Sequence, residues 1–201
     1  DQSYLYGGKW GAGDVKYVDL NNDGKIDIGK NTLADPGDRT IIGNSAPRYS
    51  YGITAGFEYK TFDFEMFWQG VGKRDFMPGG SAFWGFTSEW DTPLKSALDY
   101  WTADNIAAYF PRPNWNNGGN RQTCDRYLQN AAYLRLKNIT LGYTIPHVVL
   151  KKVGISRLRV YLQGENLLTF TPLIDAFDPE IIDNMTYPIT KKVSVGLNLT
   201  F

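Results

Sequence analysis

An Asp- and Asn-rich run near the start of the chain has the spacing of a calcium-binding loop. Asp19, Asn21, Asp23 and Asp27 stand at the first, third, fifth and ninth loop positions, and Gly24 stands where the chain must turn sharply. An EF-hand-type loop needs this pattern, because Ca²⁺ takes about six to eight oxygen ligands within one tight turn. The run therefore predicts a structural Ca²⁺ site, since no nucleophile or general base stands beside it.

The ligand set of this loop is incomplete in the sequence. Lys25 would supply its backbone carbonyl, but the last loop position, which should be acidic, holds Lys30. We expect a later carboxylate to close the site, with Asp38 as the first candidate and Asp35 as the second. The alternative is an Asp/Asn/Gly turn that holds no metal.

Tryptophan is concentrated in the segment between residues 72 and 131. A flat indole ring can stack on the apolar face of a sugar or anchor a protein partner. The alternative is that these rings pack against one another and stiffen the segment. The candidate substrate- or partner-binding residues are Trp84, Trp90, Trp101 and Trp115.

Catalysis and nucleic-acid binding find no support in the composition. The chain has a single histidine, His147, and a single cysteine, Cys124, so no Ser/His/Asp or Cys/His set can be assembled. Asp178 and Glu180 sit in a segment with no sign of burial. The 21 basic residues are balanced by 21 acidic ones, and no basic stripe favours nucleic acid. We expect a protein that is not an enzyme.

Five segments that alternate apolar and polar residues must position these groups. In the last, Val193, Val195, Leu197 and Leu199 share one face, and small polar residues share the other. Period-two alternation predicts antiparallel strands with unlike faces. The phase of the apolar residues slips within the third segment, and a β-bulge near residues 137–138 would account for the slip. The alternative is that Leu134 and Leu136 lie above the membrane. The predicted strands are 48–60, 62–71, 132–145, 156–167 and 192–201.

The connections between these strands alternate between short and long. Residues 60–61 form a tight hairpin and residues 146–155 hold a short helix, whereas 72–131 and 169–191 are long loops, with one helix expected over 91–101. Bacterial outer-membrane barrels have short periplasmic turns and long extracellular loops. The pattern predicts an all-β fold, an antiparallel transmembrane β-barrel segment, with residues 1–47 as a further extracellular loop. Five strands cannot close a barrel, so we expect a fragment whose missing strands precede residue 1.

Several blocks of the sequence together resemble one family. They are Gly13–Asp27, Asp38-Arg-Thr-Ile-Ile-Gly-Asn44, Tyr133–Pro146, Leu158-Arg-Val-Tyr161, Glu165–Phe170 and Gly196–Phe201. In this order they resemble the C-terminal part of SusC/RagA-type TonB-linked outer-membrane proteins. In that family the second block follows the Asp-rich loop almost directly, so residues 28–37 are an insertion, and this favours Asp38 as the displaced carboxylate.

The resemblance implies a 22-stranded barrel in the outer membrane, plugged by an N-terminal domain. It implies a SusD-like surface lipoprotein as partner, TonB as the energy source through regions absent here, and oligosaccharides or peptides as cargo. A second hypothesis is a soluble, calcium-stabilised, β-rich carbohydrate-binding module, in which a second sheet covers the aromatic face. A third is a surface adhesin that does not depend on TonB.

Overall fold

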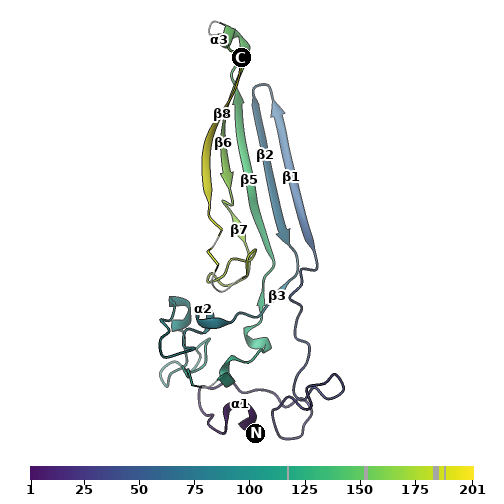
Figure 1. Cartoon of the computed structure of the whole chain (residues 1–201), viewed down its shortest axis with the longest axis vertical. Coiled ribbons are helices and arrows are strands. Elements are labelled where there is room, and N and C mark those ends of the chain that lie inside the picture. Colours follow the sequence, from purple (N-terminus) through teal and green to yellow (C-terminus); the bar gives the residue numbers. More distant parts are fainter. Residues whose placement is uncertain (117, 152–153, 183–185, 188) are drawn as a thin grey trace. The chain divides into compact units, whose positions relative to one another are not determined.

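The computed structural model describes residues 1–116, 118–151, 154–182, 186–187 and 189–201 (Figure 1). The chain divides into two compact units, which we call the loop unit (Asp1–Gly43 and Met77–Gln129) and the sheet unit (Asn44–Phe76 and Asn130–Phe201). This division differs from the predicted one, because residues 1–43 do not stand alone but fold together with most of the predicted 72–131 loop.

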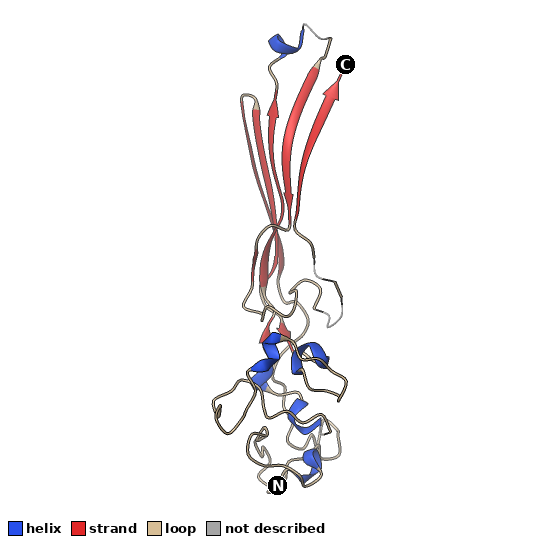
Figure 2. Cartoon of the chain, turned by 90° about the vertical axis from the view of Figure 1, so that its left-hand side faces the viewer, coloured by secondary structure: helices blue, strands red, loops and turns tan. Residues whose placement is uncertain are grey.

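The sheet unit is built on five long antiparallel strands in the order β1-β2-β5-β6-β8, which lie side by side in Figures 1 and 2. Short β7 pairs with the start of β5, and β3 pairs with β4 in a separate two-stranded sheet. The strands are β1 (Ser50–Tyr59), β2 (Phe62–Val71), β3 (Asp75–Phe76), β4 (Gln129–Asn130), β5 (Tyr133–Thr144), β6 (Arg157–Glu165), β7 (Thr169–Phe170) and β8 (Lys192–Thr200).

The predicted strands and short connections are confirmed within a few residues. Lys60 takes the left-handed conformation, with φ 56°, in the tight turn that joins β1 to β2. Helix α3 (His147–Leu150) lies in the short connection after β5. The β2–β5 register shifts between Phe67 and Trp68, which leaves Lys137 as the extra residue between Leu136 and Asn138. This bulge restores the phase of the apolar residues, which is the first of the two alternatives that the sequence left open.

One face of the sheet is a continuous apolar surface, which we call the apolar face. The register aligns Tyr59, Phe62, Tyr143 and Leu197 in one row across the strands, and a parallel row contains Phe57, Phe64, Leu141, Leu162 and Val195. Phe64 is half-buried, and the exposures of the other residues in these two rows range from 37% at Tyr143 to 74% at Val195. No second sheet covers this face among the residues that the structure describes. The sandwich that a soluble carbohydrate-binding module requires is therefore not present in that part of the chain.

The close approach of β1, β2 and β5 depends on Gly70. A Cβ at this position would lie 2.5 Å from the Tyr133 carbonyl oxygen and 2.6 Å from the Tyr51 ring. We predict that Gly70→Ala destabilises the sheet by about 1–3 kcal/mol, because the backbone oxygen cannot move aside. Gly52→Ala is the matched control, since its closest contact would be the Phe67 ring edge, at 3.0 Å, and the nearest backbone oxygen, that of Trp68, would lie at an ordinary 3.7 Å. Denaturation of both variants in detergent measures the effect, and equal stabilities would contradict the packing argument.

The loop unit has little regular structure but a true core. Its helical turns are α1 (Ser3–Tyr6), α2 (Gly80–Trp84), η1 (Lys95–Leu98), η2 (Gly118–Arg121) and η3 (Asp125–Tyr127). Phe83, Trp84, Phe110 and Tyr127 are almost fully buried and meet edge to face or stacked, with ring centroids 4.9–6.3 Å apart. The segment predicted as a long loop is thus a packed body.

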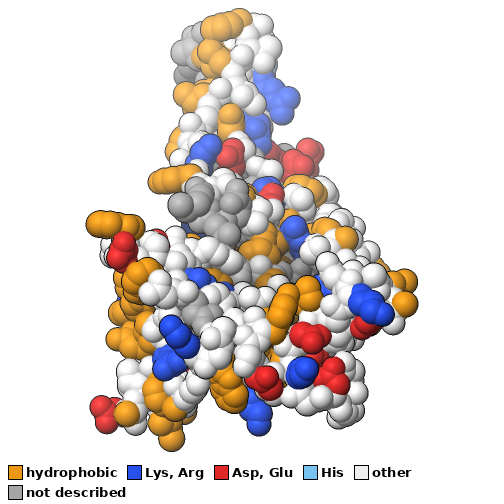
Figure 3. Space-filling view, turned by 60° about the horizontal axis from the view of Figure 1, so that its bottom comes forward, with side chains coloured by type: hydrophobic (Ala, Val, Ile, Leu, Met, Phe, Trp, Pro, Cys, Tyr) orange, Lys and Arg blue, Asp and Glu red, His pale blue; other side chains and the backbone are white. Residues whose placement is uncertain are grey.

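Helix content is lower than the sequence suggested. The helix expected over residues 91–101 is wrong, because only the four-residue 3-10 turn η1 forms there. Figure 2 shows helices only as short turns, and no described helix is long and apolar enough to cross a membrane. On the surface drawn in Figure 3, hydrophobic side chains are scattered among basic and acidic ones.

Candidate functional site

The second face of the sheet, which we call the polar face, carries charged side chains in register. Asp63 of β2 and Arg159 of β6 form an ion pair across β5, with Arg159 Nε 2.8 Å from Asp63 Oδ1. Gly142 of β5 lies directly between them, and a Cβ there would collide with both charged groups. The strand in the middle therefore needs glycine for its two neighbours to pair.

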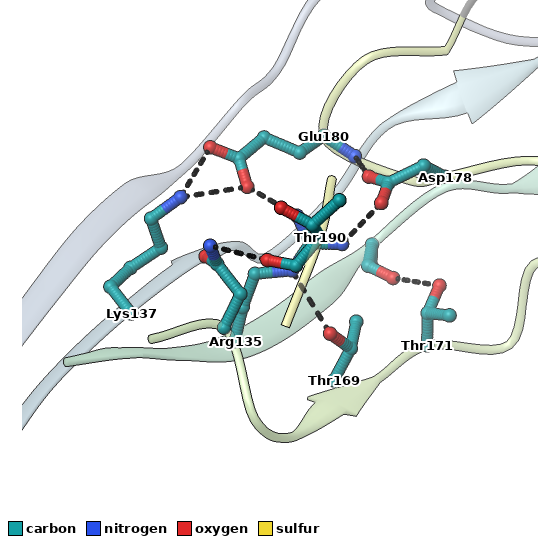
Figure 4. A network of polar contacts seen from close by, with 9 residues as sticks. Arg135, Lys137, Thr169, Thr171, Asp178, Glu180 and Thr190 are labelled. Carbon is teal, nitrogen blue, oxygen red and sulfur yellow. Dashed lines mark hydrogen bonds and ion pairs between the residues drawn. The ribbon is translucent and has the colours of Figure 1, made fainter. Parts of the chain in front are cut away.

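A denser polar network lies at the other end of β5, around Arg135 (Figure 4). Its guanidinium donates to Glu180 Oε2 at 2.6 Å, to Asp178 Oδ2 at 2.7 Å and to the Thr169 hydroxyl at 2.9 Å. Lys137 adds a second cation, with Nζ 3.0 Å from Glu180 Oε1. The Arg135 side chain is 4% exposed, so one buried cation is matched by two carboxylates.

This network fastens the segment after β7 to the polar face of the sheet. The Thr171 hydroxyl donates to the Ala132 carbonyl at 2.8 Å, and the Glu180 backbone N–H donates to Asp178 Oδ1 at 2.9 Å. Asp178 and Glu180 side chains are only 13% and 23% exposed. The expectation that these two acids lie unburied in a loop is wrong, because Arg135 draws them onto the sheet.

In the loop unit, an ion pair between a buried carboxylate and a partly exposed guanidinium joins two segments about a hundred residues apart in sequence. Arg112 donates from Nε to Asp14 Oδ1 at 2.7 Å and from Nη2 to Asp14 Oδ2 at 2.6 Å. Asn120, which is 4% exposed, donates to Asp14 Oδ1 and accepts from the Val15 N–H. We call Asp14, Arg112 and Asn120 the clasp. It ties residues 14–15 to η2, which α1 also contacts through Tyr6.

The charge state of Asp14 is set by competing effects. Burial alone would raise the pKa of this carboxyl, but hydrogen bonds from Arg112, Asn120 and the Gly11 N–H outweigh it and hold the pKa below its usual range. The Asp14 side chain is 1% exposed. The carboxylate is therefore charged at neutral pH, and its charge is compensated by Arg112.

The carboxylates of the Asp-rich loop accept hydrogen bonds from the loop backbone. Asp19 accepts from the N–H groups of Asn22 and Gly24, and Asp23 accepts from that of Lys25. Asp38 closes the loop from outside, with Oδ1 2.7 Å from Leu20 N and Oδ2 2.8 Å from Asp27 N. The structure thus brings Asp38 to the loop, at the place where the sequence expected a closing carboxylate.

Asp38 and its backbone partners also fix the charge of this group. Burial acts to raise the pKa of Asp38, but the hydrogen bonds from the Asp27 and Leu20 N–H groups lower it further than burial raises it. Gly24 takes φ 83°, the left-handed conformation that the sharp turn requires.

The oxygen donors suit Ca²⁺ in type but do not converge. Among the described residues, no group of three or more His, Cys, Asp or Glu side chains is placed to hold a metal ion. The carboxylates point to backbone N–H groups, as in the metal-free turn that the sequence left as an alternative.

Two curated relatives match almost the whole chain. TonB-dependent receptor P3 of Formosa agariphila is 29% identical over 205 residues, which cover 92% of this chain and 19% of the relative. TonB-dependent receptor SusC of Bacteroides thetaiotaomicron is 28% identical over 193 residues, which cover 92% of this chain and 17% of the relative. The chain thus spans only about a fifth of the length of these relatives. No protein-family model matches it.

A solved structure matches the fold as well as the sequence. The RagAB peptide importer in its closed-closed state aligns with 80% of this chain at a TM-score of 0.63 and 28% identity, which covers 18% of the importer chain. The chain is a segment of a SusC/RagA-type TonB-dependent receptor. Its five-stranded sheet is accordingly an antiparallel β-barrel segment, as the strand pattern predicted.

The tryptophans of this receptor segment do not form one site. Trp84 lies in the aromatic core of the loop unit at 8% exposure, so the packing alternative describes it. Trp90 is 86% exposed and Trp115 is 47% exposed. Trp101 is half-buried and lies against Gly13. Ligand contacts by Trp90, Trp101 and Trp115 stay a prediction.

The groups that sequence reasoning missed in this receptor segment are Arg135, Arg112 and Asn120. Each pairs with a partner far away in the sequence: Asp178 lies 43 residues from Arg135, and Asp14 lies 98 residues from Arg112. One signal was present for Arg135. It is a charged residue flanked by leucines on both sides in a strand, and such a residue needs a counter-charge if its face is covered.

Proposed function

We propose that this chain forms the C-terminal strands and part of the extracellular loops of a TonB-dependent outer-membrane importer. The observation that carries the proposal is the pair of unlike faces on one antiparallel sheet. One face exposes rows of Tyr, Phe, Leu and Val, and the other carries ion pairs and amides. An exposed apolar surface of this extent marks contact with a membrane or a partner.

Strand length supports lipid as the contact. The long strands have 9 to 12 residues, and a tilted transmembrane β-strand needs about 9–11. Aromatic residues lie at both ends of β1, with Tyr49 and Tyr51 near its start and Phe57 and Tyr59 near its end. Such positions suit the aromatic girdles at the two membrane interfaces.

The polar face then lines a water-filled lumen. Charged groups such as Asp63 and Arg159 are tolerated there, because water and the partner charge both compensate them. The Arg135 network would hold the segment after β7 against the lumen wall. Cargo would pass this face during import, whereas the apolar face would stay in contact with acyl chains.

The proposal includes a partner and an energy source outside these residues. A SusD-like lipoprotein would cover the extracellular mouth, and TonB would act through the regions that precede this segment in the receptor. The similar solved structure, RagAB, is a peptide importer. Oligosaccharides are the other class of cargo that the family resemblance implies. We propose one of these two classes as the cargo.

Growth on defined nutrients tests the proposed function. The gene for the full-length receptor is deleted in its native host, and growth is measured on oligosaccharide or on peptide as the sole carbon source, with a strain that lacks TonB alongside. We expect both strains to lose growth on the same nutrient, and the re-introduced gene to restore it. Wild-type growth of the receptor deletion on every nutrient would contradict import.

Calcium at the Asp-rich loop is a separate prediction. If Ca²⁺ binds, saturating metal raises thermal stability by mass action, about 2.7 kcal/mol at a hundredfold excess over Kd. The full-length receptor is melted with Ca²⁺ and with chelator, and so is Asp19→Asn. A calcium-dependent rise that Asp19→Asn abolishes supports the site. Equal melting temperatures with Ca²⁺ and with chelator would contradict the site and favour the metal-free turn, which Asp38 closes through its two backbone hydrogen bonds.

A further inference from the structure

A cavity of about 370 Å³ lies within the loop unit, where residues 13–16 meet the segment after η1. Its wall combines two cations, Lys16 and Arg126, with the rings of Trp101, Phe110 and Tyr127. We propose that this cavity, which we call the cation cavity, binds a carboxylate group of the imported cargo. The inference rests on the proposed import function and narrows its cargo to acidic molecules.

Arg126 is held in place before any ligand arrives. Its Nε donates to the Tyr127 hydroxyl at 3.2 Å, and its Nη2 donates to the carbonyl oxygens of Ala108 and Tyr109 at 3.2 and 3.0 Å. Its Nη1 makes no hydrogen bond to any other described residue. The guanidinium is thus held through Nε and Nη2, while Nη1 is available as a donor. Such a group can form a charge-assisted hydrogen bond to a carboxylate without first being ordered.

The charge of the cavity is positive. Lys16 is exposed at the rim, and neither Lys16 nor Arg126 forms an ion pair with a described acidic residue. The one carboxylate in the wall is Asp14, whose side chain is 1% exposed and whose charge is taken up by Arg112 at 2.6 Å. Lys16 and Arg126 thus face the cavity without a negative partner, and a bound anion would provide the missing negative charge.

The remaining wall is aromatic and apolar. Trp101 lies so close to Gly13 that a Cβ at Gly13 would collide with the indole ring, and Gly13 takes φ 86°. Ile106, which is 76% exposed, stands at the rim. A site with convergent cations and an apolar wall suits a carboxylate attached to an apolar or flat-faced body. Two sources fit, the C-terminus of a short peptide and a uronic-acid sugar.

Binding to the purified full-length receptor in detergent tests the cation cavity. The probes are a tripeptide with a free C-terminus, the same tripeptide amidated, a galacturonate trisaccharide and a neutral galactose trisaccharide. We expect one of the two acids to bind, and its neutral counterpart to bind about tenfold more weakly or not at all. Which acid binds identifies the source of the carboxylate.

Two variants locate the effect. Lys16→Gln should weaken the acid that binds by about five- to tenfold, since the Lys16 side chain makes no hydrogen bond to another described residue and its loss leaves the fold intact. Lys9→Gln is the matched control, being an exposed lysine of the same unit outside the cavity wall. Arg126→Lys keeps the positive charge but loses the planar guanidinium with its several fixed N–H donors, and it should also weaken binding of the acid.

The proposal is overturned if neither acid binds, if acid and neutral probes bind equally, or if Lys16→Gln behaves like Lys9→Gln. Failure of the import function is distinguishable from failure of this site. A receptor that binds the acid but does not support growth would contradict import alone. A receptor whose growth phenotype holds while Lys16→Gln leaves binding and uptake unchanged would contradict the cation cavity alone.

Discussion

Replacing Arg135 with alanine is expected to release the segment after β7 from the sheet. The substitution removes the buried cation that pairs with both Asp178 and Glu180, and only Glu180 keeps a second cation, Lys137. Removing one partner of a buried ion pair costs about 3–5 kcal/mol. Backbone amides of residues 171–182 should therefore exchange with solvent roughly a hundred- to several-thousandfold faster, because their protection depends on this local closed state.

Hydrogen exchange of the full-length receptor in detergent measures this effect. Arg157→Ala is the matched control, because Arg157 lies exposed on β6 and forms no ion pair with a described residue. Lys137→Ala should have a smaller effect, about 1 kcal/mol, since its side chain is 21% exposed and its charge is partly hydrated. Unchanged exchange over residues 171–182 in Arg135→Ala would refute the fastening role of the network.

Replacing Asp14 with alanine is expected to open the clasp in the loop unit. The change leaves the Arg112 guanidinium and the Asn120 amide without their carboxylate partner. We expect it to lower the free energy of unfolding by on the order of 3 kcal/mol. The loss is smaller than for a fully buried pair, because the Arg112 side chain is 36% exposed. The N–H of Val15, which donates to Asn120, should lose protection first. Asp104→Ala, at an exposed acid of the same unit, should leave exchange unchanged.

The same residue predicts how the loop unit responds to acid. The pKa of Asp14 is lower in the folded state than in the unfolded chain. Its contribution to stability is therefore fully present above the unfolded value, about 4, and is lost as the pH falls through the lowered folded value. Unfolding of the loop unit should become easier below about pH 4 in the wild type. In Asp14→Ala that acid-side loss should shrink, and an identical acid response in both proteins would contradict the assignment.

Local alternation was sufficient to predict the sheet, because a strand's two faces repeat every two residues. The β1–β2 hairpin, the short helix after β5 and the bulge at Lys137 all follow from patterns between residues close together in the sequence. The packing of the loop unit could not be predicted from such local patterns, because its core joins Tyr6 to Asn120 and Phe83 to Tyr127, which are far apart in the sequence. Composition marked Trp84 as a ligand contact, whereas its burial depends on those distant rings.

The candidate site was predictable only in part for the same reason. Asp38 could be predicted as the closing carboxylate, because the Asp-rich loop lacks an acidic residue at its last position. The structure brings Asp38 to this loop through two hydrogen bonds from backbone N–H groups. Arg135 and Arg112 carry no local motif. Their roles arise from tertiary pairing, which spacing along the chain cannot express.

The central claim, that one face of this sheet touches acyl chains and the other touches water, is tested most directly by spin labels along β1. Single cysteines at Ile53, Thr54, Ala55, Gly56 and Phe57 are introduced into the full-length receptor carrying Cys124→Ser, and the labelled protein is placed in lipid vesicles. Power saturation then compares collisions with oxygen, which concentrates in lipid, and with a water-soluble nickel complex. The account predicts that oxygen dominates at residues 53, 55 and 57 and nickel at 54 and 56. Equal access to nickel at all five positions, or no difference between odd and even residues, would contradict it.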